Sequence, residues 1–175
     1  MATFFLSRDG NISVFKVGVV IAIVGGLLVV GGFILASIEQ NTFRSPLEVP
    51  IPPETTVLAT DELSPASRRI FYESLLEPED VFRYYDRLLA EQDGVDINDP
   101  NRERCIRNPS RGDFESYTPG DGSVPFEYRC LFQQISLLGI DKATLITIQP
   151  GVRNDATGQN FEGTTRIDYE QYWEP

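Results

Sequence analysis

One short stretch of the chain gathers side chains that could bind a metal ion. In DGVDINDPN, residues 93–101, carboxylate and amide oxygens of the kind that Ca²⁺ prefers lie close together. The spacing is not that of an EF-hand, since the bidentate Glu and the central Gly are absent. We therefore expect a solvated loop after a helix rather than a calcium site. The donors considered are Asp93, Asp96, Asn98, Asp99 and Asn101.

The composition removes the commonest kinds of catalytic site. The chain has no His, which excludes Ser-His and Cys-His catalysis and removes the commonest metal ligand. Asp168 and Glu170 lie on one face of an expected strand, but acidic pairs are common in a chain with 26 acidic residues. Nucleotide-binding glycine loops, haem motifs and nucleophile elbows are absent. We expect no catalytic residue, no metal site and no cofactor, and thus no enzyme.

Cys105 and Cys130 are the only two cysteines. An even count in an exported domain favours a disulfide bond. The alternative is two independent buried thiols. A bond would also constrain the long loop at residues 95–125, which is rich in turn-forming residues.

An uncharged stretch of 22 residues, positions 17–38, precedes all the residues discussed so far. As a helix it would extend roughly 33 Å, enough to cross a bilayer core of about 30 Å. It is longer than the apolar region of a secretory leader, and Ile34 and Leu35 occupy positions where a cleavage site needs small residues. We predict an uncleaved anchor. Arg8 and Lys16 before it favour a cytoplasmic tail at residues 1–16.

Small residues recur along the anchor with a period that fits one face of a helix. Glycines repeat every seven residues, and small side chains lie four residues after each. Such a stripe permits close approach of a second membrane helix, although glycine is frequent in membrane helices generally. We predict helix packing against an integral membrane protein, or a second copy, through Gly18, Ala22, Gly25, Gly32 and Ala36.

Pro-rich sequence follows the anchor. SPLEVPIPPE, residues 45–54, suits neither a helix nor a central strand, so we expect residues 39–54 to form an extended spacer. It would hold a domain of residues 55–175 away from the bilayer or lie along a partner.

The domain is expected to be α+β. PEDVFRYYDRLLAEQDG, residues 78–94, has a Pro start, an acidic first turn and one apolar face, which predicts a helix. Alternation predicts strands, with an ambiguous second segment that could begin a helix. The fold class is thus an extracytoplasmic antiparallel sheet with one packed helix, behind one transmembrane helix. The expected strands are 55–60, 68–75, 126–137, 143–149 and 164–173.

The charge and the last residues bear on partners. The formal net charge of −11 should repel nucleic acid and anionic lipid headgroups, and it fits either a basic protein partner or simple solubility. In DYEQYWEP, Tyr169 keeps the alternation of a core strand. We predict that Trp173, with Tyr172, contacts a partner, because Tyr and Trp are favoured at interfaces.

The segment RRIFYESLLEPEDVFRYYDRLLAEQ resembles a unit of small envelope proteins of filamentous green phototrophic bacteria. There, an anchor and a Pro-rich spacer precede a strand and a helix that begins P-E-D/E-V and carries paired aromatics. Those proteins usually continue with Gly-Trp, whereas Gly94 is followed here by Val95. The resemblance implies that such chains can be accessory subunits of photosynthetic or respiratory membrane complexes.

Taken together, the sequence predicts a non-catalytic, single-pass accessory subunit of a membrane complex. The expected location is the bacterial cytoplasmic membrane, with the domain in the periplasm or outside the cell. The alternative is a free-standing, anchored envelope domain that binds a ligand or a cell-wall component.

Overall fold

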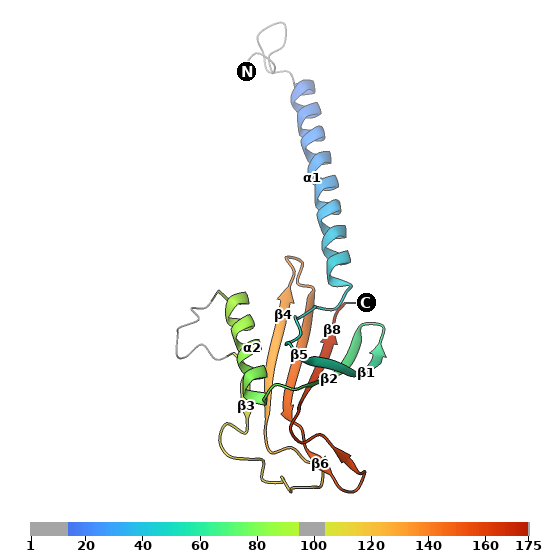
Figure 1. Cartoon of the computed structure of the whole chain (residues 1–175). Helices are drawn as coiled ribbons and strands as arrows, with labels where there is room; N and C mark the ends of the chain where they lie inside the picture. Colours follow the sequence, from blue (N-terminus) through green and yellow to red (C-terminus); the bar gives the residue numbers. More distant parts are fainter. Residues whose placement is uncertain (1–13, 95–103, 175) are drawn as a thin grey trace. The chain divides into compact units, whose positions relative to one another are not determined.

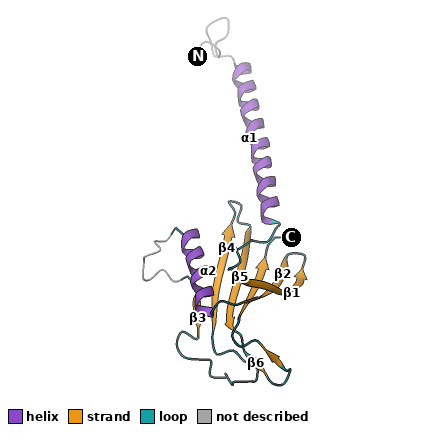
Figure 2. Ribbon diagram, in the orientation of Figure 1, coloured by secondary structure: helices purple, strands orange, loops and turns teal. Residues whose placement is uncertain are grey.

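A computed structural model of the chain describes residues 14–94 and 104–174 (Figure 1). The chain forms two compact units, residues 1–42 and residues 43–175. The described part of the first unit is one long helix. The second contains an antiparallel sheet and one further helix, as the colouring by secondary structure shows (Figure 2). The α+β class predicted from the sequence is confirmed.

Helix α1, Val14–Phe43, is longer than the predicted span of residues 17–38 at both ends. The helix continues past the apolar stretch to Phe43, and the Thr42 hydroxyl there donates to the carbonyl oxygen of Ile38. Thirty residues correspond to about 45 Å of helix. The helix is long and apolar enough to span a membrane.

Helix α2, Pro78–Gln92, begins and ends close to the predicted positions. Proline opens the first turn, and the acidic residues there favour the positive end of the helix dipole. Val81, Tyr85 and Leu89 are buried on one face. Gly94 follows the helix with φ +67°, a conformation that glycine adopts without strain.

The main sheet has six antiparallel strands in the order β1-β2-β8-β5-β4-β3. All five predicted strands are present, and the ambiguous second segment is a strand. The structure adds the short edge strand β3 and the separate pair β6 and β7, which were not predicted. The bounds are β1 Thr55–Ser64, β2 Ser67–Ser74, β3 Ile106–Asn108, β4 Glu127–Ile135, β5 Asp141–Pro150, β6 Arg153–Asn154, β7 Gln159–Asn160 and β8 Thr165–Tyr172.

One face of this sheet forms the core with α2, which lies against β4 and β5. Alternate residues of the inner strands are buried, as alternation in the sequence indicates. Tyr169 is 2% exposed, so its predicted place in the core is confirmed. The largest fully buried side chains on the central strands are Ile146, Ile148, Ile167 and Tyr169.

The Pro-rich segment differs from the free spacer expected at residues 39–54. It lacks helix and strand from Ser45 to Glu54, as predicted, but it packs on the domain. Val49 belongs to the core cluster. The carbonyl oxygen of Leu47 accepts hydrogen bonds from Thr144 Oγ1 at 2.7 Å and from Gln171 Nε2 at 2.8 Å. Proline prevents regular structure, but the carbonyl oxygens of a Pro-rich segment remain free to accept hydrogen bonds. Here side chains of the sheet donate to one of them.

Candidate functional site

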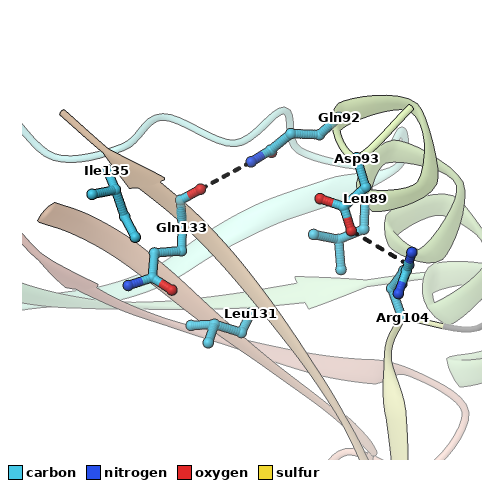
Figure 3. Close-up of a pocket in the computed structure, with 7 residues that line it drawn as sticks. All are labelled: Leu89, Gln92, Asp93, Arg104, Leu131, Gln133 and Ile135. Carbon is cyan, nitrogen blue, oxygen red and sulfur yellow. Dashed lines mark hydrogen bonds and ion pairs between the residues drawn. The ribbon is translucent and has the colours of Figure 1, made fainter. Parts of the chain in front are cut away.

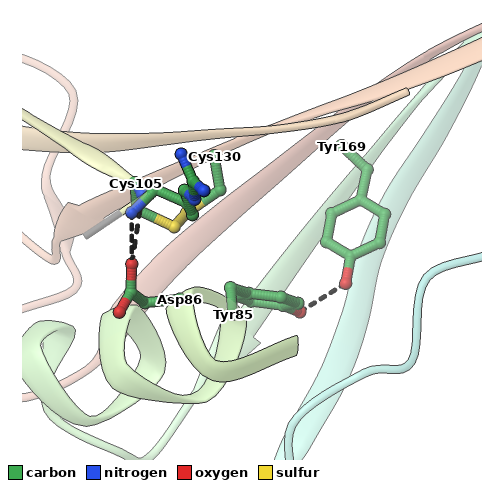
Figure 4. The surroundings of a disulfide bond; sticks show 6 residues. Tyr85, Asp86, Cys105, Cys130 and Tyr169 are labelled. Carbon is green, nitrogen blue, oxygen red and sulfur yellow. Dashed lines mark hydrogen bonds between the residues drawn. A yellow bond between two sulfur atoms is a disulfide. The ribbon is translucent and has the colours of Figure 1, made fainter. Parts of the chain in front are cut away.

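The two cysteines lie at the edge of the sheet nearest α2. Their sulfur atoms are 2.03 Å apart, which is the pairing predicted from the sequence. Cys130 comes from β4, whereas Cys105 directly precedes β3, and both are buried. The bond therefore fastens the chain that returns from the long loop to the edge of the sheet (Figure 4).

Asp86 supports the same junction and was missed by the sequence analysis. It is 2% exposed on α2, and its Oδ1 accepts hydrogen bonds from the backbone N–H groups of Arg104, at 2.6 Å, and Cys105, at 3.3 Å (Figure 4). The signal was present in the sequence: Asp86 lies one helical turn from Phe82 and Leu89, on the apolar side of the helix. An acidic residue at such a position needs donors from elsewhere in the fold.

The paired carboxylates of β8 are structural partners of one arginine. Arg69 Nε donates to both oxygens of Asp168, at 2.9 and 2.8 Å, and the Arg69 guanidinium also lies 3.4 Å from Glu170. Hydrogen bonding to Asp168 raises the pKa of Arg69. Both carboxylates are thus held by a permanent cation on the face of the sheet opposite α2, which is how a cross-strand ion pair stabilises a sheet.

Three tyrosines form the centre of the core. The hydroxyls of Tyr85 and Tyr169 hydrogen-bond to each other, and the Tyr72 ring packs edge-on against Tyr169 with centroids 4.9 Å apart. Burial is the main cause that raises the pKa of both Tyr85 and Tyr169. These hydroxyls are neutral and buried, so they pack the core and join α2 to β8.

The metal-site candidate falls largely outside the described residues. Asp96, Asn98, Asp99 and Asn101 lie in the part that the structure leaves undescribed. Asp93 is described, and its carboxylate forms an ion pair with Arg104 at 3.3 Å. Within residues 14–94 and 104–174, no group of three or more His, Cys, Asp or Glu side chains is arranged to hold a metal ion.

A solvent-open pocket of about 310 Å³ lies between the end of α2 and the edge of β4 (Figure 3). Its polar groups already pair across it: Gln92 Nε2 donates to the carbonyl oxygen of Gln133 at 3.1 Å, and Asp93 binds Arg104. Leu131 and Ile135 supply apolar surface. Four of its seven lining residues are polar, so the pocket lacks the predominantly apolar lining typical of small-molecule sites.

The predicted small-residue stripe lies on an exposed helix. A Cβ atom added at Gly18, Gly25 or Gly32 would meet no atom within 4 Å. None of the residues of α1 from Phe15 to Thr42 is buried. Nothing within the described part of the chain therefore uses the space that these glycines, together with Ala22 and Ala36, leave open.

The residues predicted to contact a partner lie at one end of the sheet. Tyr172 is 46% exposed, and Trp173 is half-buried. The backbone N–H of Trp173 donates to the carbonyl oxygen of Ala66 at 3.0 Å. Other large apolar side chains are exposed at this end, on the β1–β2 and β4–β5 hairpins. We call this set the apolar end; it comprises Leu63, Ile135, Leu137, Leu138, Tyr172 and Trp173.

No protein-family model matches the chain, and no curated protein or solved structure is significantly similar to it. The resemblance to small envelope proteins of filamentous green phototrophs therefore stays a prediction.

Proposed function

We propose that this protein is a non-catalytic, single-pass accessory subunit of a larger complex in a bacterial cytoplasmic membrane. Helix α1 binds an integral membrane subunit, and the acidic domain covers the extracytoplasmic face of the complex. The resemblance described above favours a photosynthetic or respiratory complex. The observation that carries the proposal is the small-residue stripe of α1, whose open space no described residue fills.

Glycines make that stripe informative. A glycine in a helix interior destabilises the helix by about 1 kcal/mol relative to alanine. Lipid tails pack equally well against larger side chains, so lipid gives no reason to keep glycine every seven residues. A second helix does, because small residues allow two backbones to approach closely and gain van der Waals contact. Gly18, Gly25 and Gly32 have the spacing for such an interface.

Composition supports a structural role for the domain. The absence of His from the whole chain removes the commonest general base. The paired carboxylates Asp168 and Glu170 bind Arg69 instead of lining a cleft. An acidic surface favours association with a basic face of a neighbouring subunit.

The proposed orientation rests on two independent features. Arg8 and Lys16 precede the span, and positive charge is concentrated on the cytoplasmic side of membrane helices. Cys105 and Cys130 lie at bonding distance, and disulfides persist in oxidising compartments outside the cytoplasm.

The test is co-purification in mild detergent, with mass spectrometry of the associated proteins, for Gly25→Leu and its control Gly31→Leu. Both positions are open in the chain, and both changes keep the helix apolar. At 100° per residue, Gly31 lies about 120° around the helix from Gly25. Gly25→Leu should insert normally but lose its partners, while Gly31→Leu keeps them. Equal recovery with both variants would reject the interface.

The second candidate is a free-standing envelope domain that binds a ligand, which the pocket beside β4 favours. It ranks lower because the polar groups of the pocket pair with one another. This candidate predicts that the wild-type protein purifies without stoichiometric partners, so the same experiment separates the two.

A further inference from the structure

The β4–β5 hairpin has a composition that is unusual for a solvent-exposed turn. Residues 130–140 carry no charge, in a chain with 15 basic and 26 acidic residues. The side chain of Leu137 is 100% exposed, that of Ile135 is 65% exposed and that of Leu138 is 57% exposed. Turns in water are normally polar, and clustered exposed apolar residues mark a contact surface.

The hairpin itself is well formed. The N–H of Ser136 donates to the carbonyl oxygen of Ile140 at 2.7 Å, and Gly139 N–H donates to the carbonyl oxygen of Ser136 at 3.1 Å. Gly139 has φ +80°, which the turn needs. The backbone therefore holds Leu137 and Leu138 outward at the tip, where the domain's own core cannot cover them.

Aromatic and apolar side chains accompany the hairpin at the same end of the sheet. Tyr172 pairs in register with Ala143, two residues into β5, and Trp173 lines a small hollow with Asp141. The backbone N–H of Trp173 also donates to the carbonyl oxygen of Ala66, in the turn that follows Leu63 at the end of β1. The strand register therefore places the residues of the apolar end at one end of the sheet (Figure 1).

The chain enters the domain at this same end. Phe43 is the first residue of the domain unit and is 6% exposed, and the Lys142 ammonium lies 5.2 Å from the centre of its ring. Lys142 is the second residue of β5, directly after the hairpin. The carbonyl oxygen of Leu47 binds Thr144, further along β5. The entry point of the chain and the apolar hairpin are therefore neighbours.

Chain length limits how far this end can lie from a membrane. Ile38 ends the apolar stretch of α1, and five helical residues to Phe43 add only about 8 Å. The headgroup layer on one side of a bilayer is roughly 5–8 Å thick. From Lys142, the hairpin reaches Leu137 within about 16 Å. These lengths are short enough for the apolar end to reach the interface.

We propose that the apolar end of the domain inserts into the interfacial layer of the bilayer that α1 spans. Leu137, Leu138 and Ile135 contact the acyl boundary, and Tyr172 and Trp173 lie at headgroup level, where amphipathic rings are favoured. Trp173 is thereby assigned to lipid in place of the protein contact predicted from the sequence. The proposal rests on α1 as a membrane span, a part of the proposed function.

The contact is apolar in origin. The domain is acidic, and anionic headgroups repel it. Insertion therefore occurs in neutral phosphatidylcholine and is insensitive to salt. It fixes the tilt of the domain on the membrane, because a second attachment point removes the freedom that a single tether leaves.

The chain's single tryptophan provides the experiment. The full-length protein is reconstituted alone into phosphatidylcholine vesicles whose lipids are brominated either near the carbonyl end or near the methyl end of the acyl chain. Bromine quenches tryptophan by contact. Trp173 emission should fall with the shallow bromine and much less with the deep one. Replacing Leu137 and Leu138 together by Asp should abolish this quenching without lowering the melting temperature, since both side chains are exposed.

Matched variants carry one tryptophan elsewhere in a Trp173→Phe background. Leu137→Trp should be quenched as strongly as wild type. Ile106→Trp, at an equally apolar position 69% exposed on β3 and about 20 Å along the sheet, should not be quenched. Leu27→Trp, in the middle of α1, should respond most to the deep bromine and reports insertion of the span.

The outcomes are distinct. Quenching of Leu27→Trp without quenching of Trp173 and Leu137→Trp overturns the proposal and leaves the anchor intact. The proposal is also overturned if Trp173 is shielded only when other subunits are present, which would identify a protein contact. No quenching of Leu27→Trp would reject the span and both proposals. If Gly25→Leu keeps its partners while Trp173 is quenched, only the proposed function fails.

Discussion

Buried polar residues fix the irregular parts of this domain to its regular core. Across the described residues, every buried side-chain nitrogen or oxygen has a hydrogen-bond partner. Asp86 holds the chain at Arg104 and Cys105, while Thr144 and Gln171 hold Leu47. Because an unpaired buried polar group is costly, these residues select one position for each loop.

Asp86→Ala should destabilise the domain by about 1–3 kcal/mol, because two backbone N–H groups lose their acceptor. Asp86→Asn keeps an oxygen in the same place and should lose less. Urea denaturation of the full-length protein in mild detergent measures both changes. Equal losses for the two variants would mean that the negative charge, and not the acceptor, is what matters.

Stability should fall above about pH 10 because of Tyr85 and Tyr169. Burial raises the pKa of both hydroxyls in the folded state above the unfolded value of about 10. Their contribution is complete below pH 10. Above pH 10 the unfolded state loses protons that the folded state retains. Each tyrosine therefore lowers the free energy of unfolding by about 1.4 kcal/mol per pH unit. Tyr85→Phe should reduce the slope of stability against pH, and an unchanged slope would contradict the assignment.

Among the helices and strands, the sequence predicts those whose apolar side chains repeat with a regular period, and it misses those that show no such repeat. Strands β2, β4, β5 and β8 alternate between buried and more exposed residues over much of their length, and α2 has a helical apolar face. By contrast, nine of the ten residues of β1 are exposed, so only its first part was predicted. Strands β3, β6 and β7 are two or three residues long, too short for any repeat.

The packing of the Pro-rich segment, residues 45–54, on the domain was missed for another reason. We call this the entry segment. Its attachment uses the carbonyl oxygen of Leu47, which any residue possesses, so no side-chain pattern marks it. Arg68 adds an ion pair to Glu48 at 2.8 Å and a hydrogen bond to Gln171 at 2.6 Å. In the candidate site, the disulfide followed from a count of cysteines, whereas Asp86 and the apolar end depend on contacts that only the fold brings together.

Fragments of the chain test whether the entry segment belongs to the fold. A fragment of residues 43–175 should fold cooperatively, because it keeps Val49 in the core and Leu47 on the sheet. A fragment of residues 55–175, which starts at the domain boundary expected from the sequence, leaves Thr144 and Gln171 buried without Leu47. It should be less stable by several kcal/mol. Thermal denaturation followed by circular dichroism compares the two fragments. Equal melting temperatures would show that residues 43–54 act as a free spacer and do not stabilise the domain.

At the scale of the whole molecule, the proposed arrangement is an anchor, a short junction and a domain with two points of contact with the membrane. Regions 1–42 and 43–175 are separate compact units. Between the end of α1 at Phe43 and the first hydrogen bond to the sheet at Leu47 lie only three residues. Such a short junction keeps the domain close to the end of α1, which suits a subunit that stays against one face of a complex.

The orientation of the chain has a direct test. Fusing alkaline phosphatase after Pro175 should give an active enzyme in bacteria, because that reporter needs an oxidising compartment. A green fluorescent protein fused at the same position and exported in unfolded form should stay dark. The reverse pattern would place the domain in the cytoplasm and remove the compartment argument for the bond between Cys105 and Cys130.

The position of β8 has a consequence for biosynthesis. The last strand of the domain to be synthesised lies between β2 and β5 and pairs with both along its whole length. Until it emerges, β2 and β5 have no common neighbour, and the core lacks Ile167 and Tyr169. The sheet thus closes only when translation of the domain is complete. A chain whose sheet stays open to its last strand can still pass unfolded through a protein-conducting channel, and a chain truncated before β8 would expose an incomplete core to proteases.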